Sequence, residues 1–331
     1  MIEGRKRTAT ILATLCVTAL GGSVLVASPT FAEPDIDDVE ARVDTLYHEA
    51  EQASERYNDA RVELDEAEVK LRALRADLER QSDKVDEIRE EVAAAVVSQY
   101  QGSALSSTTQ VLLSENPDAF LDQLSTVSEY NNQQSQMMAD FAIQAKQLEM
   151  REEAAEREVA RIAAMEKQLA EEEAEIKEKA GEAEDLLAEL EEEEREAALS
   201  RSSSRTPVAA ADVPASGRAG AAISYAMAQV GDAYVYGAAG PDAFDCSGLT
   251  MMAWGQAGVG LPHSSGGQMG YGSPVSSSAL QPGDLVFYYS PMSHVGMYIG
   301  NGMIVHAANP GSGVTTAPVM SMPYSGAVRP G

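Results

Sequence analysis

The chain has 331 residues and a formal net charge of −28, and its charged residues are concentrated in one part. Residues 218–331 contain four acids, two bases and no glutamate or lysine, so residues 1–217 carry a net charge of −26. Nucleic-acid binding needs clustered lysine and arginine, and this acidic balance argues against it. The uneven charge also indicates two regions under different physical constraints.

Residues 1–32 have the three parts of a secretion signal. Three basic residues precede a largely apolar run at 8–27, and small residues at the end allow cleavage before Glu33. Threonine and glycine dilute the run, whereas a membrane anchor needs about 20 strongly apolar residues. We expect a signal peptide at 1–32 and a secreted mature chain in the cell wall, without a membrane-spanning segment. Retention of the run as an anchor is the alternative.

A heptad pattern of apolar residues begins directly after this segment. From Ile36, apolar residues recur every three or four positions with charged residues between them, over eight repeats. This pattern predicts a coiled-coil helix, and a helix over 35–99 would be roughly 100 Å long at about 1.5 Å per residue. The predicted seam consists of Ile36, Val39, Val43, Leu46, Ala50, Ala53, Tyr57, Ala60, Leu64, Ala67, Leu71, Leu74, Leu78, Val85, Ile88 and Val92, interrupted by polar Gln81.

The pattern breaks at a predicted tip and resumes in a second helix. Residues 101–117 contain helix-breaking Gly, Asn and Pro around the apolar residues Val111 to Leu113. The second helix is predicted over 119–199, with imperfections where glutamates enter its seam. Two helices of similar length predict an antiparallel coiled-coil hairpin over 33–199. A parallel coiled coil between two chains is the alternative.

A Ser-, Ala- and Pro-rich stretch at 200–217 predicts a flexible linker. The remaining residues, 218–331, suffice for one small domain with its own core. Helices are predicted first, over 218–230 and 246–256. Strands follow at 284–289, 294–299 and 303–307, separated by Gly, Pro and Asn turns. Helices followed by antiparallel strands indicate an α+β domain.

Cys246 is the one cysteine that remains after removal of the signal peptide, because the other, Cys16, lies within it. A thiol attacks as a thiolate, and the start of a predicted helix favours a negative sulfur. His294 and His306 fall on the polar sides of two neighbouring strands, so that both can face one cleft. This set fits a nucleophile, a base and an orienting group.

Two other interpretations of the same residues stay open at this point. A lone cysteine is more often buried and inert than catalytic. Zinc binding by Cys246, His294 and His306 is conceivable, but the cysteine lacks a second ligand nearby in the sequence. We expect no metal and no cofactor.

Five short motifs follow one another in the last third of the chain. Together they resemble the NlpC-type cysteine endopeptidases of bacterial cell walls, which have a papain-like fold with helices packed on an antiparallel sheet. The motifs are Tyr234–Gly237 with Phe244–Leu249, Leu261–Gln268, Leu280–Phe287, Ser293–Gly300 and Gly302–Ala307. The resemblance covers residues 218–331.

The resemblance implies a thiol protease that hydrolyses peptidoglycan. Cys246 would be the nucleophile, His294 the general base and acid, and His306 the group that orients His294. The implied substrate is the peptidoglycan stem peptide, cut between D-γ-glutamate and meso-diaminopimelate. The residues implied to contact substrate are Tyr234, Asp245, Ser247, Ser265 and Gln268. Family members often carry Arg at the position of His263, so the resemblance assigns this histidine no role.

The predicted hairpin also resembles the coiled-coil arms of peptidoglycan hydrolases that a transporter-like cell-division complex in the membrane controls. This implies a chain that its own coiled coil keeps inactive. The membrane complex would bind the tip near Val111 to Leu113 and release the site for cell division or wall remodelling. The alternative is a catalytically inactive wall-binding or scaffold protein that regulates another hydrolase.

Overall fold

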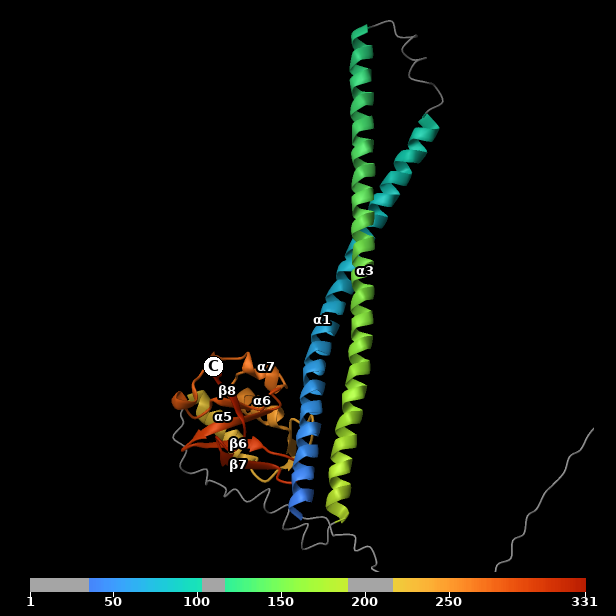
Figure 1. Ribbon diagram of the computed structural model, residues 1–331. Helices are drawn as coiled ribbons and strands as arrows, with labels where there is room; N and C mark the ends of the chain where they lie inside the picture. The colour runs from blue at the N-terminus through green and yellow to red at the C-terminus, as the bar shows by residue number, and fades with distance from the viewer. Residues whose placement is uncertain (1–35, 103–116, 190–216) are drawn as a thin grey trace, which may run out of the picture. The chain divides into compact units, whose positions relative to one another are not determined.

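The computed structural model describes residues 36–102, 117–189 and 217–331 (Figure 1). The predicted signal peptide, most of the predicted tip and nearly all of the linker lie outside these ranges. In the described ranges, no helix combines the length and the apolar character needed to cross a membrane.

Two long helices, α1 (Ile36–Gly102) and α3 (Pro117–Glu189), pack against each other in opposite directions (Figure 1). Arg42 near the start of α1 pairs with Glu182 near the end of α3 at 2.8 Å. Farther along α1, Asp77 pairs with Arg151 at 2.6 Å. The predicted antiparallel hairpin is therefore confirmed.

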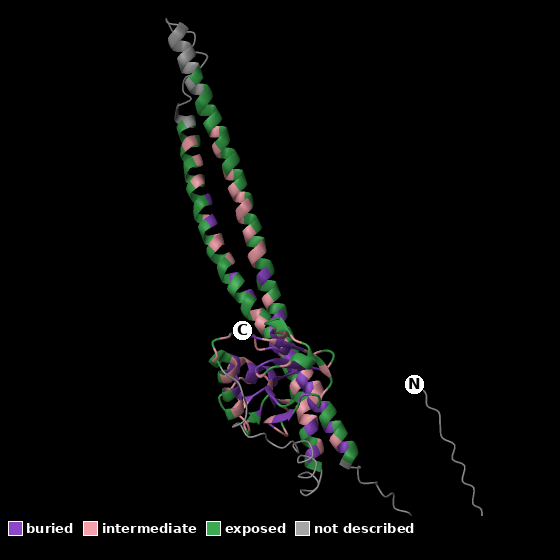
Figure 2. Ribbon diagram, turned by 90° about the vertical axis from the view of Figure 1, so that its left-hand side faces the viewer, coloured by how far each residue is buried: buried purple, intermediate pink, exposed green. Residues whose placement is uncertain are grey.

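The apolar seam of the hairpin is buried mainly in the first half of α1 (Figure 2). Leu46 is fully buried and shares a cluster with Ala183 and Leu187 of α3. Farther along, Gln81 is buried and its side-chain amide donates to the backbone and side-chain oxygens of Gln144. A polar residue is tolerated in the seam because its amide group finds these partners.

The C-terminal part of the chain is built on a six-stranded antiparallel sheet with strand order β3-β8-β4-β5-β6-β7. Short strands β1 and β2 form a separate parallel pair. The elements are α5 (Gly217–Ala228), β1 (Ala233–Tyr234), β2 (Ala243–Phe244), α6 (Cys246–Gln256), α7 (Ser265–Met269), β3 (Ser273–Pro274), η2 (Ser277–Ala279), β4 (Leu285–Tyr288), β5 (His294–Gly300), β6 (Met303–Ala307), β7 (Val314–Pro318) and β8 (Tyr324–Arg329).

Both faces of this sheet are buried, which explains why β4 is apolar at every position. Leu285 and Phe287 pack into the larger core together with side chains of α5 and α6. Val286 and Tyr288 point the other way, into a second cluster with residues of β6, β7 and β8. The larger core fixes the start of α6 against β5, and the site is built there.

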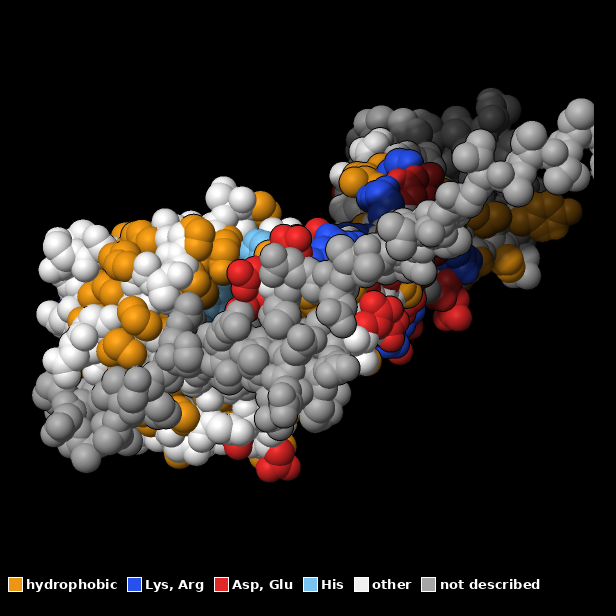
Figure 3. Space-filling model, turned by 60° about the horizontal axis from the view of Figure 1, so that its bottom comes forward, with side chains coloured by type: hydrophobic (Ala, Val, Ile, Leu, Met, Phe, Trp, Pro, Cys, Tyr) orange, Lys and Arg blue, Asp and Glu red, His pale blue; other side chains and the backbone are white. Residues whose placement is uncertain are grey.

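The α+β class predicted from the sequence is confirmed. Helix α6 and strands β4, β5 and β6 lie where the sequence predicts them. The strands β3, β7 and β8 and the short helix α7 were not predicted, because they are short or rich in Ser, Gly and Thr. Figure 3 shows a surface of the C-terminal part with few charged side chains, whereas acidic and basic side chains gather over the helices.

Candidate active site

Helix α6 begins at Cys246, with Asp245 as its N-cap. The Asp245 carboxylate accepts a hydrogen bond from the backbone N–H of Gly248 at 2.6 Å, which satisfies one of the free donors of the first turn. The thiol therefore lies at the positive end of the helix dipole, as the sequence predicts. Cys246 is a free cysteine and is 1% exposed.

Strands β5 and β6 bring the two histidines together. His294 opens β5, and the antiparallel pairing of Met297 with Val305 places His306 of β6 beside it. His294 Nε2 is hydrogen-bonded to His306 Nδ1 at 2.7 Å, and the two rings meet edge to face. Its other ring nitrogen, Nδ1, remains for a partner on the opposite side of the ring.

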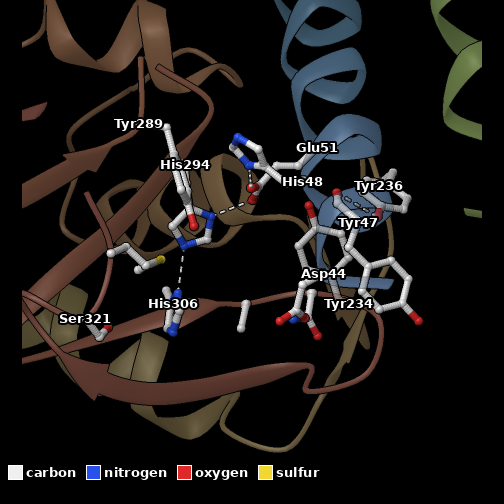
Figure 4. A pocket seen from close by; sticks show the side chains of 13 residues that line it. Asp44, Tyr47, His48, Glu51, Tyr234, Tyr236, Tyr289, His294, His306 and Ser321 are labelled. Atoms are coloured by element: carbon white, nitrogen blue, oxygen red, sulfur yellow. Dashed lines mark hydrogen bonds and ion pairs between the residues drawn. The ribbon is translucent and has the colours of Figure 1, made fainter. Parts of the chain in front are cut away.

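That partner is Glu51 of α1, whose carboxylate lies 2.5 Å from His294 Nδ1 (Figure 4). Glu51, Cys246 and His294 each present one ligand atom, and these atoms lie within 4.8 Å of one another. Burial alone would raise the pKa of Glu51, but the positive charge and hydrogen bonding of His294 hold it below its ordinary value. The base predicted from the sequence is thus paired with a carboxylate from the hairpin.

A second carboxylate, Glu55, enters the same region one helical turn farther along α1. It accepts hydrogen bonds from the Ser265 backbone N–H at 2.5 Å, the Ser265 hydroxyl at 2.6 Å and the Ser247 hydroxyl at 2.9 Å. Its Oε1 also lies 3.7 Å from Cys246 Sγ. Burial and the nearby charge of Asp245 raise the pKa of Glu55 to about 7.

Asp245 is the third point that α1 contacts. Asn58 Nδ2 donates to one Asp245 oxygen at 3.0 Å, and His263 Nε2 lies 2.8 and 3.0 Å from its two oxygens. Burial alone would lower the pKa of His263, but its hydrogen bonds and charge interaction with Asp245 raise it above 6.5. A cation at position 263 thus balances a buried carboxylate, whether it is the histidine found here or an arginine.

The surroundings of Cys246 oppose ionisation of the thiol in this arrangement. Burial is the main reason that the pKa of Cys246 is raised well above its ordinary value, and the negative charges of Glu55, Glu51 and Asp245 add to it. A hydrogen bond with the backbone of Val295 acts in the opposite direction and lowers the pKa, but by less. This arrangement therefore disfavours the thiolate that nucleophilic attack needs.

A cavity of about 470 Å³ opens beside the histidines (Figure 4). His294, His306 and Tyr234 line it from the C-terminal part, and Tyr47 and Glu51 line it from α1. The Tyr234 hydroxyl is buried and has no hydrogen-bond partner among the described residues.

The other residues that the resemblance assigns to substrate binding fall into two groups. Asp245, Ser247 and Ser265 lie beside Cys246, and their polar atoms are engaged by α1. Gln268 instead is fully buried and bonds only within the C-terminal part: it donates to the backbone oxygens of Ser247 and Pro262 and accepts from Thr250. Its environment is that of a side chain that supports α6.

Sequence reasoning missed the contribution of α1 to the site. Glu51, Glu55 and Asn58 are buried polar residues, although none belongs to the predicted heptad seam and the helix is rich in exposed charges. Their spacing of four and three residues places them on one helix face. This spacing was the available signal, but exposed charges on coiled coils have the same spacing.

Comparison with known proteins covers the C-terminal part of the chain. Residues 231–328 match the sequence model of the NlpC/P60 family. A probable endopeptidase of Corynebacterium glutamicum is 42% identical over 121 residues, which are 37% of this chain and 58% of the relative. A probable endopeptidase of Mycobacterium tuberculosis is 48% identical over 101 residues, or 30% of this chain and 26% of the relative.

Among solved structures, the peptidoglycan hydrolase RipB of Mycobacterium tuberculosis is 31% identical, with a TM-score of 0.32. The match covers 34% of this chain and 64% of that one. The chain therefore spans between about a quarter and about three fifths of the length of the curated relatives named above.

Proposed function

Residues 231–328 form a domain of the NlpC/P60 family, and from this membership we propose that the chain is a cysteine endopeptidase that hydrolyses peptidoglycan. The observation that carries the proposal is the convergence of Cys246, His294 and His306 within that domain. Relatives of this domain are named probable endopeptidases. The peptidase acts outside the cytoplasm, where its substrate lies.

The geometry supports a division of roles among the three residues. Cys246 attacks the peptide carbonyl as a thiolate after His294 Nδ1 takes its proton. His294 returns the proton to the amine that leaves, and a thioester remains on Cys246. Water activated by the same histidine then releases the acid and restores the thiol. His306, bonded to His294 Nε2 at 2.7 Å, positions the imidazole.

The finer substrate assignment follows the family resemblance. We expect cleavage of the stem peptide between D-γ-glutamate and meso-diaminopimelate. Ser247 and Ser265, which here hold the Glu55 carboxylate, lie beside the thiol in a position to hold a carboxylate of the substrate. Asp245 and Tyr234 complete the predicted contacts with the peptide.

The arrangement with α1 in place is a latent form of this peptidase. Glu51 bonds the nitrogen of His294 that catalysis needs, and Glu55 and Asn58 bond the groups predicted to receive substrate. Release requires α1 to leave the site. A transporter-like cell-division complex that binds the tip near Val111 to Leu113, outside the described residues, is the proposed trigger.

Defined muropeptides incubated with three forms of the full-length protein test this function. The forms are the unmodified chain, a chain with alanine at Glu51, Glu55 and Asn58, and the same chain with Cys246→Ala added. We expect weak cleavage by the first, strong cleavage by the second and none by the third, with new D-glutamate carboxyl ends identified by mass. A second form that folds but does not cleave would contradict the peptidase assignment and favour the inactive scaffold.

A further inference from the structure

The contact between α1 and the thiol brings together a set of metal-binding groups. Glu51 offers a carboxylate oxygen, Cys246 a sulfur and His294 a ring nitrogen, all buried and within 4.8 Å of one another. In the sequence, Cys246 has no second metal ligand nearby. The structure supplies that ligand from a helix whose Glu51 lies 243 residues before His294.

Neighbouring side chains that are not ligands contact two of these three groups, as they do in many metal sites. His294 uses Nε2 to bond His306, which leaves Nδ1 directed at Glu51. Metal-binding histidines usually bond a second group through the nitrogen that does not ligate. The other oxygen of Glu51 faces His48 Nδ1 at 3.8 Å. His294 and Glu51 thus each have a histidine neighbour that is not itself a ligand.

The chemistry of the donors selects the kind of ion. One thiolate, one imidazole and one carboxylate suit Zn²⁺, whereas Ca²⁺ and Mg²⁺ prefer oxygen alone. Two negative ligands would balance the charge of the ion in a buried place. The neighbouring cavity is lined by Glu51 and His294, so a water molecule has room to supply the fourth ligand of a tetrahedral site.

We propose that Glu51, Cys246 and His294 bind one Zn²⁺ ion when α1 is docked, and that this ion locks the latent form. Binding replaces the thiol proton, which passes to solvent, and removes the hydrogen bond between Glu51 and His294. The ion occupies both the nucleophile and the base, so peptidase chemistry stops. This inference rests on the proposed latent function, whose site it deepens.

The proposed ligands come from both α1 and the C-terminal domain, so metal binding and docking of α1 affect each other. One ligand belongs to α1 and two belong to the C-terminal domain, so departure of α1 removes a third of the protein ligands. A ligand that binds one state better stabilises that state by mass action. Zn²⁺ therefore strengthens docking of α1, and a partner that pulls α1 away also weakens the metal site.

Zinc titration of the chelator-treated full-length protein tests the proposal, with a competing metal indicator to report free Zn²⁺. We expect one tight equivalent per chain. Glu51→Gln keeps the size of the side chain, and we expect it to weaken binding at least about tenfold, since even outer-shell changes cost about 10- to 100-fold. The matched control is Glu66→Gln, an exposed glutamate on the same helix, which we expect to leave affinity unchanged.

Cobalt provides a second readout that does not depend on folding stability. Co²⁺ bound to a thiolate gives a near-ultraviolet charge-transfer band, and we expect this band in the unmodified chain and its loss in Cys246→Ser. Equal Zn²⁺ affinity in the unmodified and Glu51→Gln chains, or no tight equivalent in the unmodified chain, would overturn the proposal. Since both measurements record metal rather than cleavage, failure of the peptidase assignment leaves them interpretable.

Discussion

The first half of α1, residues 36–71, differs from its second half, residues 72–98, in what it buries. Most of the buried residues of α1, apolar and polar, fall in the first half, and among the described residues the second half adds Gln81 and Val85. The second half instead exposes Val96 and Val97. Both halves have the same heptad pattern, so the pattern does not explain the difference. The first half buries more because it packs against the C-terminal domain and because Leu46 packs against Ala183 and Leu187 of α3.

This comparison assigns different tasks to the two halves. The first half is held by specific polar contacts, which are costly to break because each leaves a buried group without a partner. The second half has few such contacts and can separate from α3 at low cost. This difference supports the proposed release of α1 by a partner that binds the tip.

The largest effect is expected from a variant that lacks the polar contacts of the first half. Alanine at Glu51, Glu55 and Asn58 leaves their partners free for substrate, and losing about 3 kcal/mol of docking energy corresponds to more than a hundredfold shift in the docking equilibrium. We expect the initial rate of muropeptide cleavage by the full-length chain to rise at least about tenfold.

The matched control places three alanines in the second half, at positions that contact no catalytic residue. We expect its cleavage rate to remain within about twofold of the unmodified chain. Equal activation by both sets would show that general loosening of the hairpin, rather than the polar contacts, controls the site. The control residues are Glu87, Glu90 and Glu91, all exposed.

The next largest effect is expected when a large side chain of the apolar seam is replaced by a small one. Leu46 is fully buried against Ala183 and Leu187, and Leu46→Ala should lower the free energy of unfolding by roughly 2 kcal/mol, the low end for such changes, because a helix pair can partly close the gap. Val96→Ala in the exposed second half should change it by less than about 0.5 kcal/mol. Chemical denaturation followed by circular dichroism measures both, and similar losses would contradict the difference between the halves.

A smaller effect is expected when Glu55 loses its charge but keeps its shape. Glu55→Gln keeps an oxygen to accept from Ser265 and removes a negative charge buried near Asp245. We expect tighter docking and a several-fold lower cleavage rate of the full-length chain, because a buried like-charge contact disappears. Glu63→Gln, an exposed residue farther along α1, serves as the control. A higher rate in Glu55→Gln would mean that the negative charge of Glu55 holds α1 in its docked position.

The smallest effect is a pH dependence inside the C-terminal domain. The raised pKa of His263 means that its ion pair with Asp245 stabilises the folded chain fully below pH 6.5. This contribution is lost as the pH rises through the raised pKa. We expect His263→Gln to flatten thermal stability between about pH 6 and 8, by on the order of 1 kcal/mol or less. Parallel pH profiles for both proteins would refute this role, and His263→Arg should retain stability at the higher pH.

Local sequence was enough to predict the parts of the fold that depend on neighbours in the chain. The heptad pattern predicts both long helices because each turn repeats the same apolar spacing. Asp245 before Cys246 predicts the start of α6, because a capping side chain acts within one helical turn. The alternation in β5 and β6 predicts that His294 and His306 share a side, and the structure confirms it.

The features that the sequence did not predict depend on tertiary contacts. Strands β3 and β8 form by pairing with partners distant in the sequence, and β7 forms by pairing with the neighbouring β6, rather than by strong local preference. Gln268 has a polar side chain typical of a binding cleft, but its partners are all inside the domain. Its predicted role in substrate binding stays a prediction that this geometry does not favour.

Patterns in the sequence were enough to predict a charged helical hairpin, an α+β domain and a cysteine with two histidines in a known order of motifs. That Glu51, Glu55 and Asn58 are buried beside the candidate active site, rather than exposed to solvent, follows from the tertiary structure alone. The physical reason is distance along the chain. Asn58 meets Asp245 across 187 residues, and no local pattern distinguishes a glutamate that faces water from one that faces a catalytic histidine.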